Sequence, residues 1–203
     1  MADFQVIVIG SGAGGLSAAL FLAKQGFSSF GGYLNPFRRS QYTFDTGVHY
    51  LGEFGRGDAG AILLDTLGIA DKLDFVELDP EEFDRFVFPD YEFTMCKGKE
   101  RYKEKLIKAF PKEENGIKKY FSVLDKVTKA TQASMSRGAG PLGMLGFLLK
   151  HPVMLKYGRA TYQKLLDEVT TDKLLQAVLS AQSGTYGLSP AKASALIPLL
   201  VLN

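Results

Sequence analysis

The sequence is poor in residue types that many functional sites require. Cys96 is the only cysteine among 203 residues, so no disulfide can form within the chain and nothing points to an oxidising compartment. The only histidines are His49 and His151. A zinc site usually needs four cysteine or histidine ligands, and the chain has only three such residues. A Cys/His metal site is therefore excluded. We therefore expect neither a disulfide framework nor a bound metal.

Long apolar runs and an excess of one charge are also missing. Lys and Arg total 24 against 22 Asp and Glu, so no nucleic-acid partner is expected. The most apolar stretches, residues 142–149 and 195–202, are far shorter than the roughly 20 residues of a membrane-spanning helix. The pattern of 142–149 favours a buried core helix, although the basic residues that follow leave peripheral membrane contact open. Without a basic leader at the N-terminus, we expect a cytoplasmic protein.

The first part of the chain has the pattern of an α/β fold. Residues 4–9 form a β-branched run that predicts a buried parallel strand. Residues 14–25 carry apolar side chains at helical spacing and predict a helix that ends near Gly26. Further strands are expected over 42–45 and 73–78, with a helix over 58–69 between them.

From residue 83 the pattern changes to a hairpin followed by helices. Aromatic and β-branched residues on both sides of Pro89-Asp90 predict a β-hairpin over 83–95, whose aromatics favour the core over a lipid-lined tunnel. Helical patterns follow from about residue 99, interrupted at Pro111 and by a glycine-rich break at 136–143. Ser189-Pro190 predicts the start of a last helix, and its apolar residues 195–202 would need a partner surface.

A glycine-rich turn links the first predicted strand to the first helix. Gly10-x-Gly12-x-x-Gly15 stands directly after the strand, which is the context that a dinucleotide-binding turn requires. Gly10 permits the tight turn, Gly12 allows close approach of a pyrophosphate, and Gly15 lets the helix pack on the strand. The N–H groups at the helix N-terminus then face the phosphates. This predicts the N-terminal part of a Rossmann-like FAD- or NAD(P)-binding domain.

An acidic residue expected to bind the ribose is absent. The fingerprint places it about 20 residues after the turn, at the end of the second strand. Between Asp3 and Asp45 the sequence contains no Asp or Glu. Phe27 to Phe30 span at most about 13 Å when extended, whereas a 12-residue helix rises about 18 Å. The second strand is therefore expected to be a stub, and loss of the carboxylate is expected to weaken binding about 10- to 150-fold.

Two arginines offer a different interpretation of the nucleotide. Arg38 and Arg39 could bind a 2′-phosphate, which would make the chain a self-contained NAD(P)-binding reductase. They stand late in the sequence for this role, and a solvated pair beside a turn explains them equally well. The residues alone leave this alternative open.

Three segments together carry a family resemblance. "VIVIGSGAGGLSAALFLAKQG", "GGYLNPFRR" and "YTFDTGVHYLGEF" resemble the FAD-dependent superfamily of phytoene desaturases, carotenoid isomerases and retinol saturases. "YKEKLIKAFPKEE" and "SGTYGLSPAKAS" resemble the retinol saturase branch, also called all-trans-retinol 13,14-reductases. The resemblance implies an FAD-dependent oxidoreductase that acts on polyene or isoprenoid lipids. It further implies NAD(P)H as an electron donor in the complete enzyme.

The same resemblance assigns site residues and a domain division. Residues 1–80 would form a partial FAD-binding, Rossmann-like domain, and residues 81–203 a partial substrate domain of hairpin and helices. His49 and Tyr50 are the candidates for proton transfer beside the flavin, although the position of His49 at a strand end favours a structural, hydrogen-bonded residue. The candidate cofactor-binding residues are Gly10, Gly12, Gly14, Gly15, Gly31, Gly32, Arg38, Asp45, Thr46 and Gly47.

The chain departs from the family pattern in two places. Family members carry a strand and its acid before the second glycine pair, whereas here Gly31 follows Gly26 almost at once. They also continue into a C-terminal part that completes the FAD site. We therefore expect a truncated, inactive form of such an oxidoreductase, with a non-catalytic remnant as a further alternative.

Overall fold

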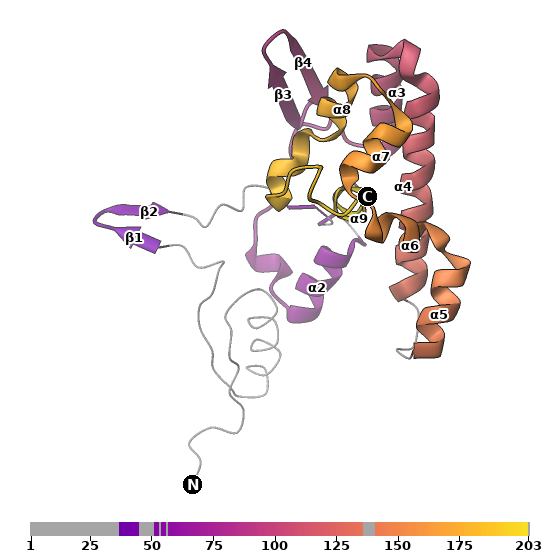
Figure 1. Cartoon of the computed structure of the whole chain (residues 1–203). Coiled ribbons are helices and arrows are strands. Elements are labelled where there is room, and N and C mark those ends of the chain that lie inside the picture. The colour runs from indigo at the N-terminus through magenta and orange to yellow at the C-terminus, as the bar shows by residue number, and fades with distance from the viewer. Residues whose placement is uncertain (1–36, 45–50, 53, 56, 136–140, 203) are drawn as a thin grey trace. The chain divides into compact units, whose positions relative to one another are not determined.

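The computed structural model describes residues 37–44, 51–52, 54–55, 57–135 and 141–202. The chain divides into two compact units, residues 1–76 and residues 77–203. Both contain helices and antiparallel strand pairs, and each is described by itself (Figure 1). The mixture of helix and strand agrees with the α/β class expected from the sequence. The predicted strand over 4–9 and helix over 14–25 lie outside the described residues.

In the described residues of unit 1, a short hairpin precedes a helix. Strands β1 (Phe37–Arg39) and β2 (Tyr42–Phe44) pair antiparallel, with Arg38 opposite Thr43. Helix α2 (Ala59–Leu67) confirms the helix predicted over 58–69, and a 3-10 turn, η1 (Ala70–Lys72), follows it.

The end of α2 has a sequence-encoded stop. Gly68 adopts a left-handed φ of 64°, and its N–H donates to the Asp65 carbonyl at 3.0 Å. The N–H of Ile69 donates to the Leu64 carbonyl at 3.1 Å, which completes a Schellman motif. A glycine is suited to this position because it has no Cβ to clash in the left-handed region.

The strand predicted over residues 73–78 is wrong. These residues adopt no strand, and Phe75 and Val76 are exposed to 53% and 89%. The side chain of Phe75 instead stacks on Phe54, with 5.2 Å between ring centroids. An apolar, β-branched run becomes a strand only when another strand accepts its hydrogen bonds, and the described residues provide none here.

The hairpin predicted over 83–95 is confirmed. Strands β3 (Asp84–Phe88) and β4 (Tyr91–Met95) pair antiparallel around the two-residue turn Pro89-Asp90. Alternate side chains face the core: Phe93 is buried, and Phe86 and Phe88 pack against the core cluster. The hairpin aromatics are therefore core residues, as their alternation predicts.

The rest of unit 2 is helical, and its longest helix forms the centre. Helix α4 (Glu114–Met135) packs against α3, α6, α7 and α9 (Figure 1). Ile117, Tyr120, Leu124 and Val127 lie along one face of α4 at helical spacing and are almost fully buried. The other elements are α3 (Lys99–Ala109), η2 (Pro111–Glu113), α5 (Pro141–Lys150), α6 (Pro152–Arg159), α7 (Tyr162–Val169), α8 (Lys173–Leu179), η3 (Ala181–Tyr186) and α9 (Leu196–Val201).

Gly116 in α4 permits an unusually close contact between helices. A Cβ built on this residue would lie 2.0 Å from the carbonyl oxygen of Val169, at the end of α7. That separation is far inside van der Waals contact, so any side chain here would push the two helices apart. Nearby, the Lys119 ammonium donates to the Glu168 carbonyl at 2.7 Å, which satisfies another of the last carbonyls of α7.

The start predicted for the last helix is wrong. Ser189-Pro190 starts only a turn, and α9 begins at Leu196, because Tyr162 and Gln163 of α7 donate backbone hydrogen bonds to Ala193 and Pro190. The apolar residues 195–202 have a partner surface in part: Ala195 and Leu199 are fully buried in the core, whereas Leu200 and Val201 are 43% and 49% exposed.

Residues 142–149 do not form the buried core helix that their pattern favours. In α5, Phe147 is buried, but Met144, Leu145 and Leu149 are exposed to 53%, 58% and 75%. The main packing contact of α5 is with α6. Helix α5 therefore lies at the edge of the unit. Apolar composition cannot distinguish an interior helix from one that presents its apolar face to the surroundings.

Candidate functional site

The residues predicted to bind FAD fall mostly outside the described part of the chain. Arg38 is the exception, and it lies on β1 with an exposed side chain. His49 and Tyr50, the candidates for proton transfer, also lie outside it, so the assignments of these residues stay predictions. The other undescribed candidates are Gly10, Gly12, Gly14, Gly15, Gly31, Gly32, Asp45, Thr46 and Gly47.

The described geometry of Arg38 fits contact with an anionic group. Arg38 and Arg39 form one strand of a tight hairpin whose turn contains Ser40 at a positive φ of 53°. The Arg38 side chain is accessible, and a guanidinium can donate paired hydrogen bonds to phosphate oxygens.

Unit 2 contains a buried chain of tyrosine hydroxyls that the sequence did not reveal. Tyr162 Oη donates to the carbonyl oxygen of Leu179 at 2.7 Å, and lies 2.9 Å from Tyr120 Oη. Because each hydroxyl carries one proton, Tyr120 must donate to Tyr162. Both side chains are fully buried. The only sequence signal is Tyr120 in the apolar stripe of α4, where a hydroxyl needs a buried partner.

Burial moves the pKa values of these tyrosines further from neutral pH. Loss of water around the phenol raises the pKa of Tyr120, and the same cause raises the pKa of Tyr162 and Tyr102. Tyr102 contacts the rings of Phe93 and Phe121 edge-on, at centroid distances of 6.1 and 6.0 Å. The arrangement can hold a core together, but it offers no base at neutral pH.

A polar network joins the α7–α8 corner to η2. Thr170 Oγ1 donates to Glu113 Oε2 at 2.6 Å, and the buried Gln176 amide donates to the Thr170 carbonyl at 2.9 Å. Asp167 accepts from Gln163 and Gln176, each at 3.0 Å, and these hydrogen bonds lower the pKa of its carboxyl. These hydrogen bonds connect α7, α8 and η2 and hold the corner between α7 and α8 in place.

A second polar group links α6 to α7. Glu168 Oε2 accepts from the Lys156 ammonium at 2.6 Å and from the Tyr157 hydroxyl at 3.1 Å. The hydrogen bond between Lys156 and Glu168 is the main cause of both pKa shifts. It lowers the pKa of Glu168 and raises the pKa of Lys156. At neutral pH both groups are charged, and they tie the two helices together.

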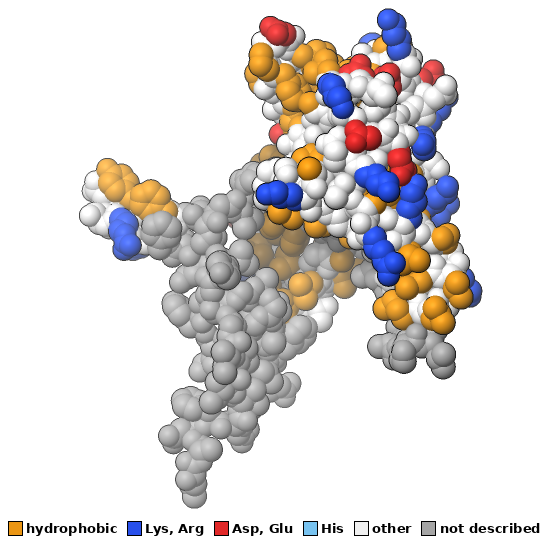
Figure 2. All heavy atoms as spheres, viewed as in Figure 1, with side chains coloured by type: hydrophobic (Ala, Val, Ile, Leu, Met, Phe, Trp, Pro, Cys, Tyr) orange, Lys and Arg blue, Asp and Glu red, His pale blue; other side chains and the backbone are white. Residues whose placement is uncertain are grey.

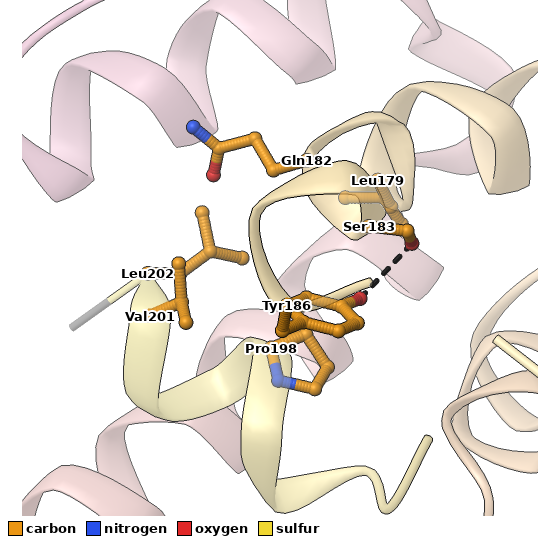
Figure 3. Close-up of a pocket in the computed structure, with 7 residues that line it drawn as sticks. All are labelled: Leu179, Gln182, Ser183, Tyr186, Pro198, Val201 and Leu202. Atoms are coloured by element: carbon orange, nitrogen blue, oxygen red, sulfur yellow. Dashed lines mark hydrogen bonds between the residues drawn. The ribbon is translucent and has the colours of Figure 1, made fainter. Parts of the chain in front are cut away.

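A small cavity lies between η3 and α9 (Figure 3). Its volume is about 10 Å³, enough for about one water molecule and far below the several hundred Å³ of typical ligand sites. Ser183 Oγ and Tyr186 Oη lie 3.0 Å apart on its wall. The cavity is lined by Leu179, Gln182, Ser183, Tyr186, Pro198, Val201 and Leu202. It has no room for a polyene.

In the described part of the chain, His, Cys, Asp and Glu side chains form no group of three or more that could hold a metal ion. Cys96 carries a free thiol and is buried in the core cluster of unit 2. No described helix is both long enough and apolar enough to span a bilayer.

Comparison with known proteins shows which proteins this chain resembles. Residues 5–30 match the FAD binding domain family. All-trans-retinol 13,14-reductase of Danio rerio is 29% identical over 221 aligned residues, covering 99% of this chain and 36% of the relative. The human protein of that name is 31% identical, covering 98% of this chain and 35% of its own length. A 4,4′-diapophytoene desaturase of Methylomonas sp is 25% identical, with coverage of 96% and 39%.

These matches confirm the resemblance to the retinol saturase and phytoene desaturase superfamily. The match to an FAD binding domain also supports FAD as the cofactor, in the region where the glycine turn predicts it. The chain spans little more than a third of the length of these relatives. The similarity extends through unit 2, because nearly all of this chain is aligned.

Proposed function

We propose that this chain carries part of an FAD-dependent oxidoreductase of the retinol saturase and phytoene desaturase type, with polyene or isoprenoid lipids as the substrate class. The observation that carries the proposal is the match of residues 5–30 to an FAD binding domain, at the position of the Gly10-x-Gly12-x-x-Gly15 turn. The alignment with retinol reductases along almost the whole chain supports the same lineage.

In this proposal the protein residues bind and orient, while the cofactor carries the redox chemistry. When bound, FAD supplies the group that accepts or donates hydride, and NAD(P)H is the proposed electron donor of the complete enzyme. Gly10, Gly12 and Gly15 would receive the pyrophosphate on backbone N–H groups, and Arg38 would add a guanidinium beside a phosphate. His49 and Tyr50 are proposed to hold or move a proton near the flavin.

We further propose that the chain by itself binds FAD weakly. No carboxylate is available for the ribose between Asp3 and Asp45. The alignment with the Danio rerio relative spans 221 positions although this chain has 203 residues, so at least 18 positions have no counterpart here. We propose that part of this gap falls between Gly26 and Gly31, where the expected strand and its acid are missing. Loss of a charged hydrogen bond to the ribose corresponds to a loss of affinity of about 10- to 150-fold.

Flavin titration tests the proposal. The purified chain is titrated with FAD and with NADPH, and binding is followed by quenching of flavin fluorescence and by calorimetry. We expect weak FAD binding that Gly12→Val removes, because the added side chain would block the pyrophosphate. Gly184→Val is the matched control, since a Cβ at Gly184 meets nothing within 4 Å.

Other outcomes of this titration separate the alternatives. Saturable NADPH binding without FAD binding would instead support the self-contained NAD(P) reductase. If a folded chain binds neither nucleotide, the non-catalytic remnant is favoured. Activity on a polyene is then measured only in a chain that binds FAD.

A further inference from the structure

Helix α5 presents an apolar surface that the fold of unit 2 does not bury. Met144, Leu145 and Leu149 stand on one side of the helix with the half-buried Leu148, because residues separated by three or four positions share a helix face. Leu155 of α6 adds a further apolar side chain that is 44% exposed. Figure 2 shows the resulting cluster of hydrophobic side chains over α5 at the lower edge of unit 2.

The helix is nevertheless anchored, so its exposed face is held in a fixed orientation within the unit. Phe147 is buried, and its ring lies 4.8 Å from that of His151. The N–H of His151 donates to the Phe147 carbonyl at 2.8 Å, and α6 begins at the next residue, Pro152. Helix α6 in turn packs against α4.

Positive charge surrounds this surface. From residue 126 to residue 166 the sequence has seven Lys or Arg and no Asp or Glu, although the whole chain is nearly balanced. Lys150 ends α5 and Arg159 ends α6, and both side chains are exposed. In Figure 2, Lys and Arg side chains gather beside the apolar cluster over α5. The first acids that follow are Asp167, which accepts from the neutral amides of Gln163 and Gln176, and Glu168, whose charge is offset by Lys156.

We propose that the surface formed by Met144, Leu145, Leu149 and Leu155 with Lys150 and Arg159 docks unit 2 onto an anionic lipid surface. Apolar side chains flanked by lysine and arginine match the boundary between acyl chains and negatively charged headgroups. A ten-residue helix rises only about 15 Å, so α5 lies on the bilayer and does not cross it.

Charge favours lipid over a second copy of the chain as the occupant. In a two-fold dimer the same surface would face itself, so the basic residues of both copies would be brought together. An anionic bilayer reverses this effect, since each nearby Lys or Arg adds attraction. The inference depends on described residues of unit 2 and holds whether or not the chain binds FAD.

Vesicle co-sedimentation of the full chain tests this docking surface. The vesicles are phosphatidylcholine, either alone or with about one third phosphatidylserine, at physiological salt. We expect binding to the anionic vesicles, little binding to neutral ones, and release in about 1 M salt, where charges are screened within about 3 Å.

Matched variants separate the apolar and electrostatic contributions. Leu149→Gln is expected to reduce binding about 10-fold, the loss expected when one leucine side chain stays in water. The control is Val87→Gln in the hairpin. Val87 is an apolar residue that is 68% exposed, against 75% for Leu149, and its replacement should leave binding unchanged. Lys150→Glu is expected to reduce binding to anionic vesicles at least 5-fold, whereas Lys112→Glu, an exposed change in η2, has a smaller effect.

Circular dichroism confirms that each variant is folded before its binding is interpreted. Absence of vesicle binding by the folded chain would overturn the proposal, as would equal losses for Leu149→Gln and Val87→Gln or equal binding to neutral and anionic vesicles. Sedimentation velocity provides one more outcome: a dimer that Leu149→Gln dissociates, without vesicle binding, would assign the surface to a second copy instead. Neither readout involves flavin, so failure here is distinguishable from failure of the proposed function.

Discussion

The two units differ in what their described residues show. Unit 1 carries all the residues predicted to bind FAD, and among its described residues only Leu67 is a buried apolar side chain. Unit 2 has a continuous core of aromatic and aliphatic side chains and, in its described part, neither a metal-ligand cluster nor, in the cavity at η3, room for a ligand. The described core of this chain therefore lies in unit 2, apart from the residues predicted to bind the cofactor.

The largest expected effect comes from truncating a core residue of unit 2. Leu165→Ala removes a fully buried side chain and is expected to destabilise the unit by about 2–5 kcal/mol. Leu63→Ala, at a residue of α2 that is 42% exposed, should change stability by less than about 0.5 kcal/mol. Urea unfolding is followed by near-ultraviolet circular dichroism, which reports the buried tyrosines because the chain has no tryptophan. Equal effects of the two changes would contradict the contrast between the units.

A smaller effect is expected where α4 touches the end of α7. Gly116→Ala places a Cβ against the Val169 carbonyl, and we expect a loss of about 1–3 kcal/mol even though alanine favours helix. The control is Gly146→Ala in α5, where a Cβ meets nothing within 4 Å and the same change should stabilise by about 0.5–1 kcal/mol. Thermal unfolding of both variants measures the difference, and two changes of the same sign would show that the helix contact is looser than described.

The smallest effect concerns the ion pair between α6 and α7. The pKa of Glu168 is lowered in the folded chain, so its stabilising effect is present above the unfolded pKa and is lost as pH falls through the folded pKa. Lys156 has a raised pKa, so its contribution is lost only at high pH, as pH rises through the folded value. Lys156 is about half exposed, so solvent screens the ion pair. We therefore expect Glu168→Gln to lower the free energy of unfolding by less than about 1 kcal/mol at neutral pH.

The pH dependence distinguishes this pair from a general loss of packing. Urea midpoints for the original chain and for Glu168→Gln should converge as the pH is lowered from 7 to about 3, since protonated glutamate and glutamine are then similarly uncharged. The control Glu92→Gln, on the exposed outer face of the hairpin, should show a smaller change. A difference that stays constant across this range would show that Glu168 acts through shape and not through charge.

Sequence patterns predicted the elements whose signals are local. The hairpin over 83–95 followed from aromatic residues on both sides of Pro89-Asp90, and α2 from the helical pattern of residues 58–69. Pro111 marked the break between α3 and α4, because proline is tolerated in the first turn of a helix but not in its interior. The resemblance to retinol reductases also rested on short motifs, and comparison of the whole chain confirmed it.

The wrong predictions share one physical cause. Residues 73–78 and 142–149 are apolar enough for a strand and a core helix, but burial depends on the neighbours that the rest of the chain supplies. The Ser189-Pro190 start failed for the same reason, since backbone groups of α7 bind this segment before α9 can begin. The predicted FAD residues, including Arg38, and the division at residue 80 stay predictions.

The sequence by itself showed the Gly10-x-Gly12-x-x-Gly15 motif, the absence of an acid between Asp3 and Asp45, the hairpin and the spacing that makes α4 amphipathic, because each can be read from residues close together in the chain. Tertiary structure alone decided which apolar segments are covered. It also joined Tyr120 to Tyr162 and brought Gly116 against Val169. These contacts join residues 42 to 53 positions apart, and no local preference of the backbone specifies which distant side chain fills a given space.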